Sequence, residues 1–342
     1  MGWSNAVHVT DEGFHPRPAD PWWNESSFIS FRVPERELLG AIYFYFRPNQ
    51  NTAMAGAWFA DPSGDEMSTC LYDGWDWHLP IPEGADMFDF ELENGFSVQT
   101  VETQHSYRHT YQAEGCKFDV TFTADRKPCH MHSDPGEVNL GMSQFIQNVA
   151  EHATGHYEQS GVMNGTLQLG SEVIDVVDAA VIRDRSWGPR RTLRRDRKPR
   201  GAYLFARADR DHCFQAFAMS DLPWEEDPII GTTERVVSGF YVKDGIEGRL
   251  VSGTRQVLSR SADGKPMHES ITAVDEHGRT LKAEGRLVSA LKWHSYLGGI
   301  MAYWCYHEWT LDGRPDVPGE SQDWFANQHY SKWMRERVRA TS

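Results

Sequence analysis

Cysteine is scarce in this chain of 342 residues, and the five cysteines present lack the paired spacing of a disulfide framework. Long apolar runs are also missing. The longest, near residues 38–46 and 297–306, hold about ten residues each, half of what a membrane-spanning helix needs. The first six residues carry neither the basic nor the apolar region of a signal peptide. From these absences we expect a cytoplasmic protein without a membrane span and without disulfides.

Motifs for catalysis and cofactor binding are absent as well. The chain has no G-x-G-x-x-G after a strand, no Walker loop, no G-x-S-x-G elbow and no paired C-x-x-C. Fifteen histidines are present, but none forms an H-E-x-x-H or comparable ligand pattern. These absences argue against nucleotide, flavin and serine-hydrolase chemistry. We therefore expect neither a cofactor nor a metal.

Basic side chains are in the minority, since 49 acidic residues against 34 basic ones give a net charge of −15. Such a charge repels nucleic acid and anionic membranes. Residues 190–200 are the exception, with seven basic side chains and one acid, and without them the net charge is −21. We interpret this segment as a solvated basic loop. Steering of an anionic ligand and a subunit contact, for example in a homodimer, are the alternatives.

Aromatic residues are plentiful by contrast, with 13 Trp, 12 Tyr and 17 Phe, although the mean hydropathy is only −0.59. Apolar surface is therefore concentrated in large rings. These rings are numerous enough to build a core and also to line a site for a hydrophobic or aromatic small molecule.

Strand patterns dominate the chain. Residues 117–123 alternate apolar and polar side chains as a half-buried strand does, and segments such as 28–33, 38–46 and 297–311 are rich in rings and β-branched residues. Asn-Gly and Asp-Gly pairs between such segments are typical of two-residue hairpins. The pattern predicts an all-β fold of antiparallel meanders. Meanders of this kind close into barrels or pack as a sandwich to protect their edges.

Two segments show helical spacing instead, at residues 137–152 and 321–338. We place a domain boundary after the first of them, at residue 155. The sequence therefore predicts two β domains with a few short helices, residues 1–155 and residues 156–342, the second ending in a C-terminal helix.

The strongest functional motif is Arg183-Asp184-Arg185-Ser186-Trp187-Gly188, which we place at or just beyond the end of a strand. A carboxylate between two guanidinium groups stays ionised, so Asp184 is suited to act as a base or to stabilise charge. The structural alternative is an Asp–Arg ion pair that pins the strand end, with Trp187 as a core plug.

Two further regions carry candidate groups. Glu25 directly follows the Trp22-Trp23-Asn24 segment, and indole rings favour the neutral form of a neighbouring carboxyl group, which suits a general acid. The alternative is a surface glutamate beside a tryptophan pair that closes a barrel end. His294 and Tyr296 share one face of an expected strand, and they suit an acid, a base or a ligand contact. The alternative there, as for nearby His307, is an aromatic core layer with a hydrogen-bonded histidine.

Through Asp184, Trp187 and Gly188 the chain resembles the carotenoid hydratase (hydroxyneurosporene synthase)/AttH-like family. The family motif D-H-x-W-G has a histidine where this chain has Arg185. The Trp-Trp-x-Glu-Ser segment at 22–26 adds to a likeness that spans nearly the whole chain. The resemblance implies two consecutive antiparallel lipocalin-like β-barrels of the calycin type, and a family of hydratases, terpenoid cyclases and pericyclase-like enzymes.

From the motifs and this resemblance we expect a cofactor-independent, hydratase-like lyase or an isomerase. Its substrate would be a bulky apolar or aromatic small molecule such as a terpenoid, a steroid or an aromatic dimer. Hydration, dehydration, carbon–carbon cleavage and double-bond migration need only acid–base groups. The candidate catalytic residues are Asp184, with Arg183 and Arg185 as its partners, and Glu25, His294 and Tyr296 as proton donors. The candidate ligand contacts are Trp22, Trp23, Trp187, Arg190, Trp304 and His307. The alternatives are a carrier or sensor of a hydrophobic ligand, and a protein–protein module that uses the basic loop.

Overall fold

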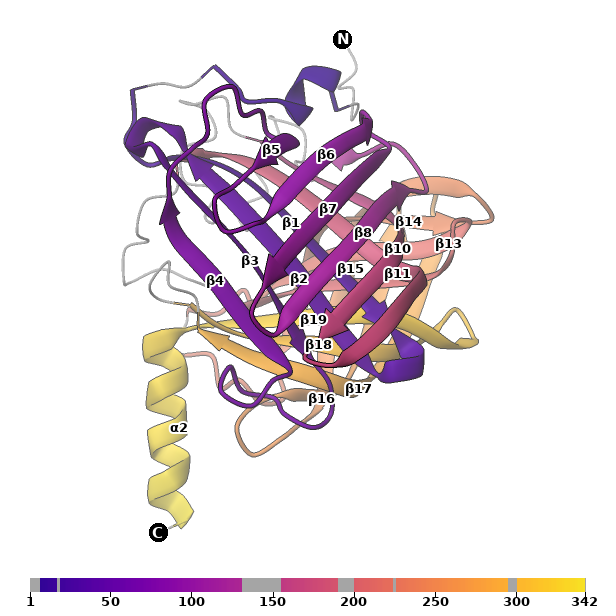
Figure 1. Cartoon of the computed structure of the whole chain (residues 1–342). Coiled ribbons are helices and arrows are strands. Elements are labelled where there is room, and N and C mark those ends of the chain that lie inside the picture. Colours follow the sequence, from indigo (N-terminus) through magenta and orange to yellow (C-terminus); the bar gives the residue numbers. More distant parts are fainter. Residues whose placement is uncertain are drawn as a thin grey trace. The chain divides into compact units, whose positions relative to one another are not determined.

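The computed structural model describes residues 7–16, 19–130, 155–189, 200–223, 226–294 and 300–341. These residues are mostly β-strand, which confirms the predicted all-β fold. They form two compact units, drawn in sequence colours in Figure 1. Within the described ranges, no helix is long and apolar enough to cross a membrane.

The first unit is one antiparallel sheet of eleven strands. In chain order these are β1 (Trp23–Val33), β2 (Leu38–Arg47), β3 (Thr52–Ala60), β4 (Tyr72–Leu79), β5 (Asp89–Glu91), β6 (Ser97–Glu102), β7 (Ser106–Ala113), β8 (Cys116–Ala124), β9 (Cys129–His130), β10 (Gly155–Leu169) and β11 (Glu172–Pro189). Short 3-10 helices accompany them, namely η1 (Val9–Glu12), η2 (Pro34–Arg36) and η3 (Pro48–Gln50). The spatial order is β4-β3-β2-β1-β11-β10-β8-β7-β6-β5, with β9 paired to β10.

Strands β10 and β11 begin at Gly155 and Glu172, yet they lie in the middle of the first sheet (Figure 1). Strand β11 pairs with β1 on one side and with β10 on the other, and β10 pairs with β8. The first compact unit accordingly includes β11 up to its last residue, Pro189. The helix expected at 137–152 lies outside the described residues.

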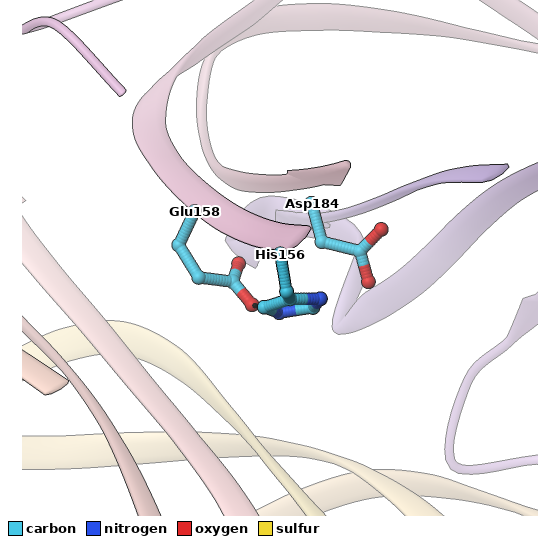
Figure 2. Close-up of side chains that lie close together, drawn as sticks. All are labelled: His156, Glu158 and Asp184. Atoms are coloured by element: carbon cyan, nitrogen blue, oxygen red, sulfur yellow. Dashed lines mark hydrogen bonds and ion pairs between the residues drawn. The ribbon is translucent and has the colours of Figure 1, made fainter. Parts of the chain in front are cut away.

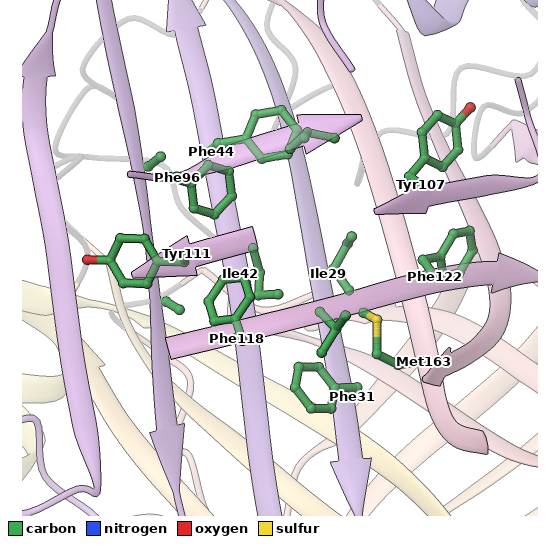
Figure 3. Packing of buried hydrophobic residues seen from close by; sticks show 14 of the residues in the cluster. Ile29, Phe31, Ile42, Phe44, Phe96, Tyr107, Tyr111, Phe118, Phe122 and Met163 are labelled. Atoms are coloured by element: carbon green, nitrogen blue, oxygen red, sulfur yellow. The ribbon is translucent and has the colours of Figure 1, made fainter. Parts of the chain in front are cut away.

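The core of the first unit is a hydrophobic cluster, rich in aromatic rings, from strands across the whole sheet (Figure 3). The centre of the Phe44 ring lies 5.1 Å from that of Phe90 and 5.8 Å from that of Phe96. Phe96 in turn lies 6.3 Å from Phe118. Many of the chain's aromatic rings therefore pack against one another, in the edge-to-face and tilted contacts that aromatic pairs prefer.

The second unit is a closed eight-stranded barrel whose neighbours follow chain order. Its strands are β12 (Gly201–Asp209), β13 (His212–Met219), β14 (Thr233–Lys243), β15 (Ile246–Arg260), β16 (Pro266–Asp275), β17 (Thr280–His294), β18 (Ile300–Leu311) and β19 (Arg314–Ala326). The Asp244-Gly245 and Asp312-Gly313 turns have positive φ at both residues, as the hairpin prediction requires. Helix α2 (Asn327–Thr341) follows β19. The helix expected at 321–338 therefore begins later than predicted, because residues 321–326 belong to β19.

Charged side chains fill part of the interior of this barrel. Arg255 is fully buried, and its guanidinium group lies 2.7 Å from Glu234, 2.5 Å from Glu269 and 2.9 Å from Asp323. Burial raises the pKa of the Asp323 carboxyl group, but the charges of nearby arginines outweigh this and lower it to about 2. The charged side chains around Arg255 are thus paired with opposite charges, as buried charges must be.

Candidate functional site

The motif at residues 183–188 lies within a strand and not at its end, because β11 continues through it to Pro189. Asp184 is opposite Phe28 of β1 and opposite Glu158 of β10. Successive side chains of a strand point to opposite faces. Arg183 and Arg185 therefore point toward the core of the first unit, and Asp184 points to the other face. The expected grouping of one carboxylate with its two flanking arginines is absent from the described residues.

On its own face Asp184 meets two side chains of β10. Nε2 of His156 lies 2.7 Å from Oε1 of Glu158. Figure 2 shows Asp184 beside them, and one ligand atom from each of the three residues lies within 4.8 Å of the other two. We call these three residues the His156 cluster. Glu158 is fully buried, His156 is nearly so, and Asp184 is partly exposed. The backbone N–H of Phe28 donates a hydrogen bond of 3.0 Å to Oδ1 of Asp184.

This cluster has two chemical uses. An imidazole that donates to one carboxylate and lies close to a second is suited to proton transfer, because the first carboxylate orients the ring and stabilises its charged form. One nitrogen and two carboxylate oxygens are also donors that a divalent transition-metal ion accepts. The alternating His156-x-Glu158 pair, whose side chains share one face of a strand, is the sequence signal that points to this cluster.

On the core face, Glu25 of β1 accepts hydrogen bonds from four directions. Its Oε1 lies 3.0 Å from the backbone nitrogen of His15 and 3.0 Å from Nε1 of Trp23. Its Oε2 lies 2.5 Å from the guanidinium group of Arg185 and 3.1 Å from Nδ1 of His15. The Arg185 guanidinium in turn lies over the ring of Trp187, 5.3 Å from its centre. Four predicted site residues are therefore brought together, and His15 joins them.

The prediction that the Glu25 carboxyl group is neutral is wrong. Burial raises the pKa of this carboxyl group, but the hydrogen bond from His15 and the charge of Arg185 outweigh it and lower the pKa. Glu25 is therefore an ionised anchor at neutral pH and not a neutral acid. The reason is tertiary, since Arg185 lies 160 residues away in the chain.

Arg183 forms a second ion pair on the core face. Its guanidinium nitrogens lie 2.9 and 3.1 Å from the two carboxylate oxygens of Glu12. Nε of Arg183 donates to the side chain of Gln159 at 3.2 Å. Burial raises the pKa of Glu12, but the charge of Arg183 and the hydrogen bonds from Arg183, Tyr157 and Tyr107 together outweigh this effect and lower the pKa. No feature of the sequence around Glu12 predicts this contact.

A family model described as a domain of unknown function (DUF7064) matches residues 8–330. The chain belongs to this family. Among curated proteins, no sequence matches it. Solved structures of similar fold include an AttH-like protein (NE1406) from Nitrosomonas europaea, with 16% identity and a TM-score of 0.58 over 93% of this chain and 96% of that one.

Two further solved structures are similar to the DUF7064 chain. Kievitone hydratase from Nectria haematococca has 11% identity and a TM-score of 0.52 over 94% of this chain and 93% of its own. CghA has 11% identity and a TM-score of 0.53 over 90% of this chain and 88% of its own. Likeness at such low identity shows the fold. It confirms the AttH-like fold that the motif at residues 184–188 indicated.

The remaining predicted residues are dispersed. His294 is the last residue of β17, and its side chain, like Arg190 and Tyr296 as a whole, lies outside the described residues. Trp22 is exposed and lies near the guanidinium group of Arg47, 5.9 Å from its ring centre. In the second unit, Trp304 is half-buried, and its ring centre lies 5.6 Å from that of Trp293. Their roles as ligand contacts or proton donors stay predictions.

His307 lies inside the second barrel and is fully buried. One ring nitrogen, Nε2, is 3.0 Å from the carbonyl oxygen of Pro266. Burial lowers its pKa, which favours the neutral ring. This environment agrees with the alternative of a hydrogen-bonded core histidine, and a ligand contact by His307 stays a prediction.

Proposed function

We propose that this protein is a hydratase-like lyase that uses acid–base catalysis without a cofactor. Its substrate is a bulky apolar or aromatic small molecule such as a terpenoid, a steroid or an aromatic dimer. The fold shared with kievitone hydratase supports a reaction of this class, although a fold alone hosts many functions. The observation that carries the proposal is the His156 cluster, in which a buried imidazole lies beside two carboxyl groups.

The acid in this proposal is His156. Glu158 accepts the hydrogen bond from Nε2, fixes the ring and stabilises the imidazolium form. Nδ1 of the charged ring then gives its proton to one carbon of a substrate double bond. Burial of the pair removes competing water, so the interaction between imidazolium and carboxylate is stronger than it is in solution.

The base in this proposal is Asp184. It takes a proton from a water molecule whose oxygen bonds to the second carbon, so the product carries one added water and no net charge. The proton then returns from Asp184 to His156 through one water, since the reacting atoms lie within 4.8 Å of one another. Dehydration runs through the same steps in reverse. Migration of a double bond uses the same acid and base without the water.

Turnover in water labelled with oxygen-18 tests this proposal. The assay panel contains terpenoids, steroids, aromatic dimers and kievitone, with mass spectrometry of the products. We expect solvent oxygen in the product and activity that survives treatment with EDTA. Replacement of the acid or the base, His156→Gln or Asp184→Asn, should lower kcat by about 10²–10⁴-fold.

Exposed residues of the same types supply matched controls. His105→Gln and Asp119→Asn alter side chains about half exposed and should leave turnover unchanged. A folded Asp184→Asn variant with full activity would remove this residue from the mechanism. Activity lost with EDTA and restored by a divalent ion would replace acid–base catalysis with a metal at the His156 cluster. A co-purifying ligand that is released unchanged under all conditions would identify a carrier.

A further inference from the structure

Arg183 is a fully buried cation whose carboxylate partner does not come from the sheet. Among the described residues, Glu12 is the one carboxylate within 4 Å of its guanidinium group. Glu12 belongs to the short helix η1, ahead of the first strand. The neighbouring Arg185 differs, because its partner Glu25 is part of strand β1 itself. The sheet therefore neutralises Arg185 and leaves Arg183 to be neutralised by the N-terminal segment.

Contacts other than Glu12 also hold the guanidinium group of Arg183 in place. Gln159 accepts from Nε of Arg183, and its own amide donates to the carbonyl groups of Gln104 at 2.7 Å and Arg126 at 2.8 Å. The hydroxyl of Tyr157 lies 3.3 Å from the same guanidinium group. A guanidinium group fixed in this way is preorganised for two parallel hydrogen bonds to a carboxylate.

Aromatic rings surround the same group. The guanidinium carbon lies 4.4 Å from the centre of the Tyr107 ring, 4.9 Å from Phe88 and 5.5 Å from Tyr157. The buried positive charge of Arg183 is therefore lined by aromatic rings. With the Glu12 side chain withdrawn, these surroundings would match a ligand that combines a carboxylate with an apolar or aromatic body.

The segment that carries Glu12, residues 7–16, forms no strand pairing with the sheet. It is attached by packing and by hydrogen bonds: Val7 packs with Trp23, Tyr157 and Trp187, and the Phe14 ring centre lies 5.1 Å from that of Phe46. The carbonyl oxygen of Gly13 accepts a hydrogen bond of 2.9 Å from Arg185, and the backbone N–H of Phe14 donates one of 3.1 Å to Asp86. His15 contacts Glu25 and stacks on Trp187, with ring centres 4.1 Å apart. Within residues 7–16, the only regular structure is the four-residue helix η1. A segment held in this way can leave without breaking a strand pairing of the sheet.

We propose that Glu12 is the chain's own occupant of a carboxylate-binding recess around Arg183, and that an apolar or aromatic carboxylic acid takes its place. The bidentate pair of Arg183 with Glu12 is then the autoinhibited arrangement of this second site. The site lies on the core face of β11, opposite the face that holds the His156 cluster, and it does not depend on the proposed lyase activity.

Binding of 3-phenylpropionate to the full chain tests this proposal, with 3-phenylpropionamide as the uncharged probe of equal shape. The acid should bind weakly to the wild type and should increase hydrogen exchange of residues 7–16. Glu12→Gln removes the competing charge and keeps the segment. It should bind the acid at least about tenfold more tightly, because a tethered competitor acts at an effective concentration in the millimolar range. The amide should bind to neither protein.

A second substitution distinguishes the recess from binding elsewhere. Adding Arg183→Met to Glu12→Gln should abolish binding of the acid. A folded Glu12→Gln protein that does not bind the acid, binds the amide equally, or binds the acid equally after Arg183→Met would overturn the proposal. If Glu12→Gln does not fold, exchange in the wild type decides. No increase over residues 7–16 with the acid, relative to sodium chloride of equal ionic strength, overturns the proposal as well.

Discussion

Replacing Glu25 by glutamine tests whether this carboxylate anchors the first unit. Glutamine has the same shape, but it carries no charge and offers one oxygen where Glu25 offers two. Both oxygens of Glu25 accept hydrogen bonds, and one of them lies 2.5 Å from the guanidinium group of Arg185. Both side chains of this ion pair are fully buried. The substitution therefore leaves Arg185 buried with no carboxylate partner in the part of the chain that the structure describes.

The expected cost of Glu25→Gln is about 3–5 kcal/mol in the free energy of unfolding, the usual penalty for breaking a buried ion pair from one side. For a unit of this size such a loss lowers the melting temperature by roughly 6–20 °C. Glu172→Gln is the matched control, since Glu172 also pairs with an arginine, Arg36, but is 46% exposed. Glu172→Gln should lower the free energy of unfolding by at most about 1 kcal/mol.

The difference between wild type and Glu25→Gln should also depend on pH. The pKa of Glu25 is lowered in the folded protein. A lowered pKa contributes stability that is fully present above the unfolded-state value and is lost as the pH falls through the folded-state value. The stability gap should therefore be largest near neutral pH and should shrink in acid.

Calorimetry at several pH values measures these effects, and hydrogen exchange of β1 and β11 peptides assigns the melting transition to the first unit. A cost for Glu25→Gln as small as that for Glu172→Gln would refute the role of an anchor. Loss of turnover without loss of stability would restore the role of a proton donor.

Three further predictions concern other parts of the molecule. In the second barrel, Arg255→Met should destabilise the protein by at least about 3–5 kcal/mol in calorimetry, because three carboxylates would lose the buried guanidinium group that they contact. Gly155→Ala should displace Trp187, since an added Cβ would lie 2.0 Å from Cζ2 of its ring. An unchanged near-ultraviolet circular dichroism spectrum would contradict this. Burial and nearby Asp73 raise the pKa of Cys70 to about 11, so alkylation by iodoacetamide should be slow near neutral pH and faster in alkali. A rate equal to that of free cysteine would be the contrary result.

Much of the fold could be predicted because its signals are local. Alternation along residues 117–123 and the turns at Asp244-Gly245 and Asp312-Gly313 depend on neighbours in the chain. The insertion of β10 and β11 into the middle of the first sheet could not be predicted in this way. It rests on pairing between β11 and β1, whose paired residues are at least 150 positions apart.

The motif residues stand out in the sequence, but their grouping depends on where the strand ends. In the structure Arg183 and Arg185 are buried and Asp184 is half-buried. Because β11 continues to Pro189, Asp184 is separated from Arg183 and joins His156 instead. Glu12 was missed altogether, since it meets Arg183 across a separation of 171 residues.

The sequence by itself determined which segments form strands, where the chain turns and which residue types are at hand for acid–base chemistry. Only the tertiary structure decided which of those residues meet. The register of β11 between β1 and β10 selects the face of every side chain in the motif, and a shift of one residue would exchange the two faces. That register is set by hydrogen bonds between strands remote in the chain. For this reason the scarcity of cysteine and the lack of cofactor motifs reduced the number of plausible reaction classes. They did not show which side chains lie together in the candidate site.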